Sequence, residues 1–286
     1  MLFDSYGPLR RVSGLLLMVF TSTALADADF IDPPPPRAES SPESSQSSSP
    51  GRDYLYNFVR IPARATAEVF RTDREGLKRN AIAIGSVGLA FAMDQEIRDW
   101  SQDNRSNASN RITTPLYDIG TPRTAAIGLV GGYSYAFLAD DGYFAQTLHL
   151  SFQSLLVSQM FTTVFKKGFQ RTRPRDSPDD PFDQSAGSES FFSGHASGTW
   201  ATLTVLAKRY PNQRAVGWSA YTIAGAVALS RIHDDGHWAS DVLAGSLVGY
   251  GIGHLTVEMS PFRNHDAVVL PIIDQEMQGV MIAVRF

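Results

Sequence analysis

Six apolar stretches with helix-forming composition, separated by polar loops that carry Gly or Pro, most constrain how this chain can fold. They cover residues 81–93, 124–139, 145–165, 197–207, 215–230 and 238–257. Few of them show the alternation of a β-strand, so the pattern indicates helices. Most are shorter than the ~18 to 20 uninterrupted apolar residues of a membrane span, and the last contains Asp241 and His254. We therefore expect one all-α, six-helix domain, soluble or monotopic rather than polytopic.

The N-terminal end has the three parts of a secretory signal peptide. Arg10 and Arg11 precede an apolar run from Val12 to Phe20, and the small-residue site Ala24-Leu25-Ala26 follows. The mature chain is expected to begin near Asp27 and to be periplasmic, either released or peripherally bound to a membrane. A retained N-terminal anchor is the alternative.

The segment after this leader is rich in Pro and Ser and has almost nothing apolar to bury. Such a segment cannot offset its ordering entropy, so we expect a flexible tether. Near the C-terminus, residues 267–273 and 279–286 indicate two short strands that form a hairpin packed on the bundle, with an edge that docks elsewhere as the alternative. The expected organisation is a signal peptide at 1–26, a disordered linker at 27–52, a helical domain at 53–260 and a β-hairpin at 261–286.

Composition excludes several classes of protein. The chain has no cysteine, so its stability must come from a packed core and not from disulfides. The net charge is −4, and no bulk basic patch argues for nucleic acid.

Three motifs carry the chemistry. In the last, residues 230–241, Asp241 follows His237 by four residues. On one helix the two would share a face, so that Asp241 fixes the imidazole tautomer and leaves one nitrogen free to attack. Arg231 supplies a planar fork of donors that suits phosphate oxygens. A zinc interpretation of His237 and Asp241 lacks a third ligand at a sensible spacing.

The other two motifs also suit an anion. Five cations follow the apolar stretch 145–165, and they form either a solvated rim or part of an anion site. Further on, Ser193 suits a helix N-cap, Gly194 allows a close backbone approach, and the helix would direct its free N–H groups at a phosphate. His195 in its first turn would be protonated beside that anion and could serve as a general acid. The five cations are Lys166, Lys167, Arg171, Arg173 and Arg175.

Together these residues resemble the three-part signature of the type 2 phosphatidic acid phosphatase superfamily, which includes bacterial acid phosphatases and vanadium haloperoxidases. The matching residues, in order, are Lys166-x6-Arg173-Pro174, Ser193-Gly194-His195 and Ser230-Arg231-x5-His237-x3-Asp241. One departure is Phe192, where the family usually has Pro before Ser-Gly-His. It casts doubt on the shape of the loop more than on the chemistry.

The resemblance implies a six-helix bundle of the phosphatidic acid phosphatase type and a metal-independent, acid-type phosphatase with no cofactor. His237 would attack phosphorus and form a phosphohistidine, Asp241 would orient it, and His195 would protonate the leaving group. The phosphate oxygens would be held by Lys166, Arg173, Ser193, Gly194 and Arg231.

Two other functions fit the same residues: a vanadate-dependent haloperoxidase and a non-catalytic protein that binds lipid phosphates. For a phosphatase, the moderately apolar helices favour a phosphorylated lipid as substrate, with a small soluble phosphate ester as the rival. Phe191, Phe192 and Trp238 are candidate contacts for the apolar part of such a substrate, and core packing is the alternative for each.

Overall fold

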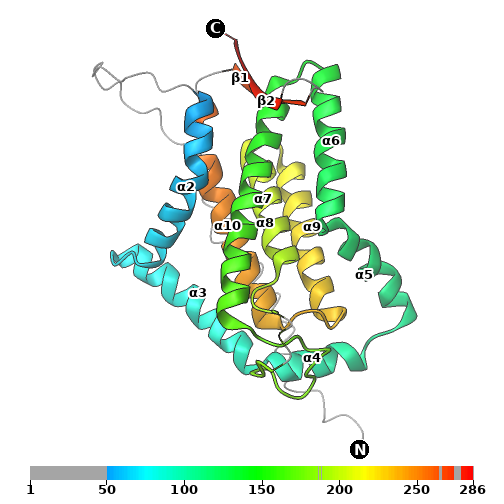
Figure 1. Cartoon of the computed structure of the whole chain (residues 1–286). Coiled ribbons are helices and arrows are strands. Elements are labelled where there is room, and N and C mark those ends of the chain that lie inside the picture. Colours follow the sequence, from blue (N-terminus) through cyan, green and yellow to red (C-terminus); the bar gives the residue numbers. More distant parts are fainter. Residues whose placement is uncertain (1–49, 186, 188, 264–265, 274–277, 286) are drawn as a thin grey trace, which may run out of the picture. The chain divides into compact units, whose positions relative to one another are not determined.

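The described part of the chain contains nine α-helices, three more than the six apolar stretches predicted (Figure 1). The structure is a computed structural model, and it describes residues 50–185, 187, 189–263, 266–273 and 278–285. The expected signal peptide and the linker up to residue 49 lie outside these residues. The helices are α2 (Pro50–Val69), α3 (Arg74–Ala92), α4 (Asp94–Asp103), α5 (Asn107–Ile119), α6 (Pro122–Leu138), α7 (Gly142–Phe169), α8 (Gly194–Arg209), α9 (Arg214–His233) and α10 (Ala239–Glu258).

The six expected helices are present, and the prediction of six was wrong because α2, α4 and α5 have no long apolar run. The α4 sequence has only Ile97 and Trp100 as apolar residues, and of these only Ile97 is buried. The linker boundary was also placed too late, because α2 begins at Pro50 and not after residue 52. Proline is tolerated in the first turn of a helix, because an N–H at that position would have no partner within the helix. The negative charge of Asp53 in the same turn interacts favourably with the positive end of the helix dipole.

Helix α8 packs against α7, α9 and α10, and its contact with α10 is the most extensive in the structure. Three glycines spaced four residues apart on α10 face the backbone of α8. An added Cβ at Gly245, Gly249 or Gly253 would meet the carbonyl oxygens of Ser193, Ser197 and Ala201 at 2.7, 2.2 and 2.5 Å respectively. These glycines therefore let the two helices that carry the second and third motifs approach closely.

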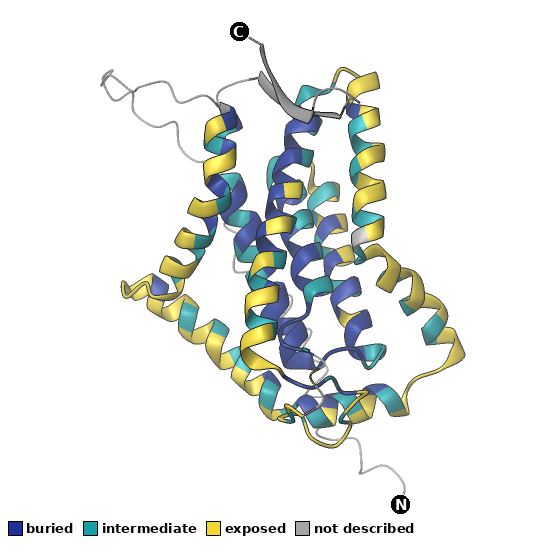
Figure 2. Cartoon of the chain, viewed as in Figure 1, coloured by how far each residue is buried: buried dark blue, intermediate teal, exposed yellow. Residues whose placement is uncertain are grey.

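Burial is concentrated in α8 and α10, whereas α2, α3, α5 and α6 carry many exposed residues (Figure 2). Large apolar side chains are common among the exposed ones, including Phe137 and Leu138 of α6, which are 80% and 83% exposed. Among the described residues, no helix combines the length and the hydropathy that crossing a membrane requires.

The chain ends in a short 3-10 helix, η2 (Pro261–Arg263), and two antiparallel strands. Strand β1 (Asp266–Ile273) pairs with β2 (Gln278–Arg285), with Val269 opposite Ile282. Residues of β1 contact α7. The turn at 274–277 lies outside the described residues.

Candidate active site

The second motif forms the N-terminus of α8, as predicted. Ser193 is the N-cap, and its hydroxyl accepts a hydrogen bond from the amide of Ala196 at 3.4 Å. The Ser193 amide donates to the carbonyl of Asp241 at 3.0 Å, which ties this motif to the third one. Gly194 packs closely against α7, because an added Cβ would lie 3.2 Å from the side chain of Gln159.

The third motif is arranged differently from the prediction, because His237 precedes α10. The helix begins at Ala239, with Trp238 as its N-cap. Asp241 then occupies the first turn and accepts a hydrogen bond from the Trp238 amide at 2.9 Å. The backbone of Arg231 holds the preceding loop, since its carbonyl accepts from the amides of Gly236 and His237 at 3.1 and 3.2 Å.

A serine lies between the histidine and the aspartate. His237 Nδ1 is 3.7 Å from Asp241 Oδ2, which is longer than a hydrogen bond. The hydroxyl of Ser190 is 3.3 Å from His237 Nδ1 and donates to Asp241 Oδ2. All three side chains are buried. Sequence reasoning assigned no role to Ser190, which stands only three residues before the second motif.

Burial lowers the pKa of His237 to about 4, although contact with Asp241 opposes this effect. Burial alone would raise the pKa of Asp241, but His237 and Arg171 together bring it below its ordinary value. The pair is therefore a neutral imidazole beside an ionised carboxylate near neutral pH. This arrangement leaves a buried histidine unprotonated and able to act as a nucleophile.

The three predicted phosphate-binding cations lie in one electrostatic cluster with the histidines. Lys166 lies in the last turn of α7 and donates to the Glu189 carbonyl at 2.8 Å. Burial together with the charge of Arg173 lowers its pKa to about 8. Burial also lowers the pKa of Arg173 and of Arg231. An anion is the ligand that would best offset three partly desolvated positive charges.

His195 faces this cluster from the first turn of α8. Burial, followed by the charges of Arg231 and His237, lowers its pKa to about 3. The ring stacks on Tyr117 of α5 with centroids 5.0 Å apart. Its Nε2 is buried and has no hydrogen-bond partner among the described residues. These surroundings therefore hold His195 neutral near pH 7. The expectation that it is protonated applies only when an anion is bound.

Tyr117 is a second residue that the sequence did not point to. The guanidinium of Arg231 lies 4.4 Å from its ring centroid, and Arg231 also donates to Asp234 at 3.2 Å. One aromatic ring thus contacts both a cation and a histidine of the signature. It comes from a helix far upstream of all three motifs, and no pattern in the sequence links it to them.

The three aromatic residues proposed as substrate contacts belong to the core. Phe191, Phe192 and Trp238 are buried, and the two phenylalanines pack with Ala244. The indole of Trp238 donates to the carbonyl of Thr172 at 2.9 Å. The alternative of ordinary packing was therefore right for all three.

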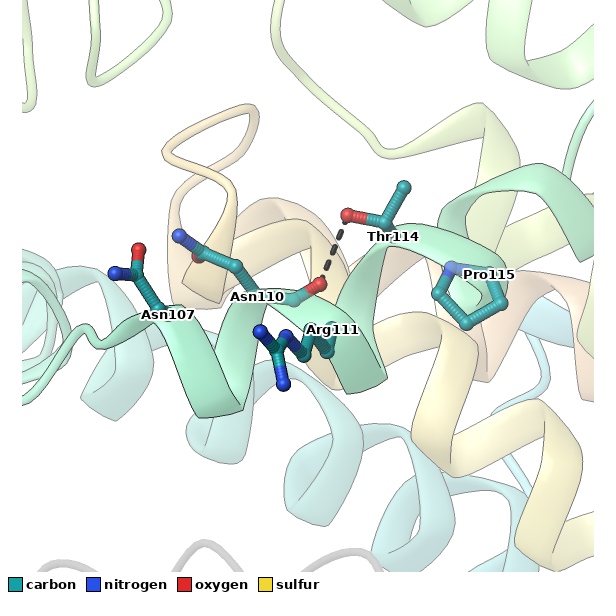
Figure 3. Close-up of a pocket in the computed structure, with 5 residues that line it drawn as sticks. All are labelled: Asn107, Asn110, Arg111, Thr114 and Pro115. Carbon is teal, nitrogen blue, oxygen red and sulfur yellow. Dashed lines mark hydrogen bonds between the residues drawn. The ribbon is translucent and has the colours of Figure 1, made fainter.

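An open hollow of about 570 Å³ lies on α5, one to three turns before Tyr117 (Figure 3). Its walls are mixed polar and apolar, and the hydroxyl of Thr114 donates to the backbone carbonyl of Asn110 at 2.8 Å. None of the signature residues lines it. The lining residues are Asn107, Asn110, Arg111, Thr114 and Pro115.

Residues 148–265, which include all three motifs, match the sequence model of the PAP2 superfamily. Among curated relatives, the chain is 26% identical over 111 residues to a lipid A 4'-phosphatase of Porphyromonas gingivalis, covering 37% of this chain and 47% of the relative. It is 35% identical over 92 residues to a lipid A 1-phosphatase of the same organism, covering 32% of this chain and 18% of the relative. The chain thus spans less than half the length of either relative.

Two solved structures are similar to this chain. The first is a transmembrane PAP2-type phosphatidylglycerolphosphate phosphatase from Bacillus subtilis, with a TM-score of 0.48 and 21% identity, covering 73% of this chain and 94% of that one. The second is LpxE from Aquifex aeolicus, with a TM-score of 0.48 and 16% identity, covering 58% of this chain and 95% of that one.

Proposed function

We propose that this chain is a metal-independent, acid-type phosphatase that hydrolyses a lipid phosphate through a phosphohistidine at His237. The observation that carries the proposal is the grouping of His237, His195 and Asp241 with a cluster of partly desolvated cations at the N-terminus of α8. The match of residues 148–265 to the PAP2 superfamily model supports the reaction class.

In the first step of this mechanism, the oxygens of the bound phosphate are held by cations and by the start of α8. His237 attacks phosphorus through the nitrogen that does not face Ser190, so an N–P bond forms while the ester P–O bond breaks. The bound anion raises the pKa of His195, which burial and the nearby cations lower to about 3, and His195 gives its proton to the leaving oxygen. The phosphate ligands are Lys166, Arg173, Ser193, the Gly194 amide and Arg231.

In the second step, His195 accepts a proton from a water molecule, which attacks phosphorus and breaks the N–P bond. Inorganic phosphate leaves and neutral His237 is restored. Asp241 stabilises the positive imidazole while the N–P bond exists. Each charge-assisted hydrogen bond to the phosphate contributes about 1.5–3 kcal/mol. The contribution to catalysis is largest for contacts with the atoms on which charge develops in the transition state.

Two observations support a lipid as the substrate. The curated relatives are named as phosphatases of lipid A. The outer helices also expose large apolar side chains, such as Ile84 of α3 and Trp218 of α9, which are 68% and 70% exposed. Such surface favours contact with a membrane face, from which a phosphorylated lipid head group would enter the site.

The test compares a short-chain lipid phosphate with a chromogenic soluble ester, both in EDTA. We expect turnover of both, inhibition by vanadate, and a higher kcat/KM for the lipid because its apolar part adds binding energy. Equal kcat/KM values would contradict a lipid as the preferred substrate and would favour a soluble phosphate ester. Absence of turnover with phosphate still bound would favour a binding protein, and vanadate-dependent bromination would favour a haloperoxidase.

The proposed location is the periplasm, with the mature chain starting near Asp27. It is supported by the arrangement of Arg10, Arg11, the apolar run and Ala24-Leu25-Ala26. N-terminal sequencing of protein from fractionated cells tests it. An intact Met1 on the purified protein would contradict it.

A further inference from the structure

Arg171 lies among the cations that follow α7, but its guanidinium bonds two buried carboxylates. One nitrogen, Nη1, donates to Asp241 Oδ1 at 2.7 Å, and the other, Nη2, donates to Asp94 Oδ2 at 2.6 Å. Nε donates to the Pro181 carbonyl at 2.7 Å. Every nitrogen of this guanidinium is thus engaged by the protein, so Arg171 is not a phosphate ligand.

Aromatic rings enclose the same guanidinium. Its carbon lies 4.5 Å from the ring centroid of Phe91 and 5.3 Å from that of Trp238. Arg171 is only 4% exposed. A planar cation held by hydrogen bonds at its edge and by rings at its faces has little freedom to move, and it therefore fixes the carboxylates that it bonds.

Asp94 is the first residue of α4 and lies outside the part of the chain that matches the superfamily. Its Oδ1 accepts from the amide of Ser240 at 2.9 Å, and its Oδ2 accepts from the hydroxyl of Ser240 at 2.6 Å. The same hydroxyl accepts from Arg171 Nη1 at 2.7 Å. Asp94 thus bonds both Arg171 and the residue that directly precedes Asp241.

We propose that Asp94 and Arg171 are positioning residues that hold Asp241 and set how much negative charge it presents to His237. A guanidinium bonded to Asp241 alone would neutralise much of the charge that stabilises a positive imidazole. Because Asp94 also pairs with this guanidinium, the positive charge of Arg171 offsets less of the negative charge of Asp241. Asp241 therefore stabilises a positive His237 ring more strongly. Burial raises the pKa of Asp94 to about 6 and Arg171 opposes the rise, so Asp94 is ionised above that pH.

This inference rests on the proposed function, and the variants are chosen to separate the two. Asp94→Asn preserves the shape of the side chain and removes its charge. Ser240→Ala is a milder change that removes one hydroxyl from the same network. Asp99→Asn is the matched control, because Asp99 is also on α4 but its side chain is 54% exposed and bonds Gln95 and Arg98.

Steady-state kinetics above pH 6 give the first readout. We expect Asp94→Asn to lower kcat by about 10–100-fold with KM and vanadate inhibition changed less than about twofold, because the phosphate ligands are untouched. Ser240→Ala should show a smaller loss of kcat, and Asp99→Asn none. A rise in KM equal to the loss of kcat/KM, or an unchanged kcat in a folded Asp94→Asn protein, would overturn the proposal.

The second readout does not need turnover. The charged groups that influence His237 include Asp241, Lys166 and Arg173, with Arg171 and Asp94 behind Asp241. Removing the charge of Asp94 should lower the pKa of the His237 ring, measured by NMR of labelled histidine, relative to Asp99→Asn. An unchanged His237 pKa would overturn the inference even if the wild-type protein has no activity, whereas inactive wild-type protein with the expected shift would contradict only the proposed function.

Discussion

The hydroxyl of Ser190 is the link between the nucleophile and its carboxylate. It contacts His237 Nδ1 and donates to Asp241, while the direct distance between imidazole and carboxylate is 3.7 Å. Asp241 also accepts from Arg171 and from the backbone of Trp238. The orientation of His237 therefore depends on a network and not on a single ion pair.

Removing that hydroxyl should slow catalysis without unfolding the protein. A hydrogen bond to a charged group contributes about 1.5–3 kcal/mol, which corresponds to roughly 10–10²-fold in rate. We expect Ser190→Ala to lower kcat by this factor in steady-state assays. Ser185→Ala is the control, because its exposed hydroxyl bonds Asp183 in the same loop. Equal kcat values in the two variants would exclude a role for Ser190.

The depressed pKa of His195 predicts how stability depends on pH. Its folded pKa of about 3 lies below the ordinary 6.5, so its contribution to stability is present above pH 6.5 and is lost as the pH falls toward 3. Denaturant unfolding at about pH 7 and about pH 4.5 should therefore show a larger loss of stability in the wild type than in His195→Gln. Parallel losses in the two proteins would show that His195 is not held neutral by burial.

The signature residues could be predicted from the sequence because each motif is a short run of residues with a fixed spacing. Ser190, Tyr117 and Asp94 could not, because their roles depend on tertiary contacts. Tyr117 reaches His195 from α5 and Asp94 reaches Ser240 from α4, so no local pattern brings them into the site. Spacing also misled the prediction for His237, which lies before α10 and not within it.

At the level of elements, the close approach of α8 and α10 brings the second and third motifs together. It depends on glycines of α10 that face backbone atoms of α8. Their spacing of four residues is visible in the sequence, but nothing in the sequence identifies the partner helix. By contrast, α2, α4 and α5 were missed because their helical pattern is amphipathic and polar.

Two substitutions on the same helix test the contact. At Gly249 a new Cβ would lie 2.2 Å from the Ser197 carbonyl, whereas at Gly251 it would meet nothing within 4 Å. Gly249→Ala should destabilise the protein by about 1–3 kcal/mol through overpacking. Gly251→Ala should be neutral or stabilising by up to about 1 kcal/mol, because Ala is the better helix former. Similar melting temperatures for the two variants would contradict this packing.

For the molecule as a whole, the bundle has buried central helices that hold the candidate catalytic residues and outer helices that support them. Helices α8 and α10 supply His195 and Asp241, and the loops before them supply Ser190 and His237. The outer helices α4 and α5 support this centre through Asp94 and Tyr117 while exposing apolar side chains elsewhere. The proposed phosphatase therefore needs the helices upstream of the superfamily match as well as the match itself.

Trapping the covalent intermediate tests the central claim most directly. A radiolabelled phosphate ester is mixed with the purified protein, the reaction is stopped with base within one turnover, and the labelled residue is mapped. We expect a base-stable, acid-labile phosphohistidine at His237, absent from His237→Ala and retained in the control His254→Ala, which replaces a histidine that lies on α10 outside the site. Undiminished turnover or labelling in His237→Ala would contradict the account.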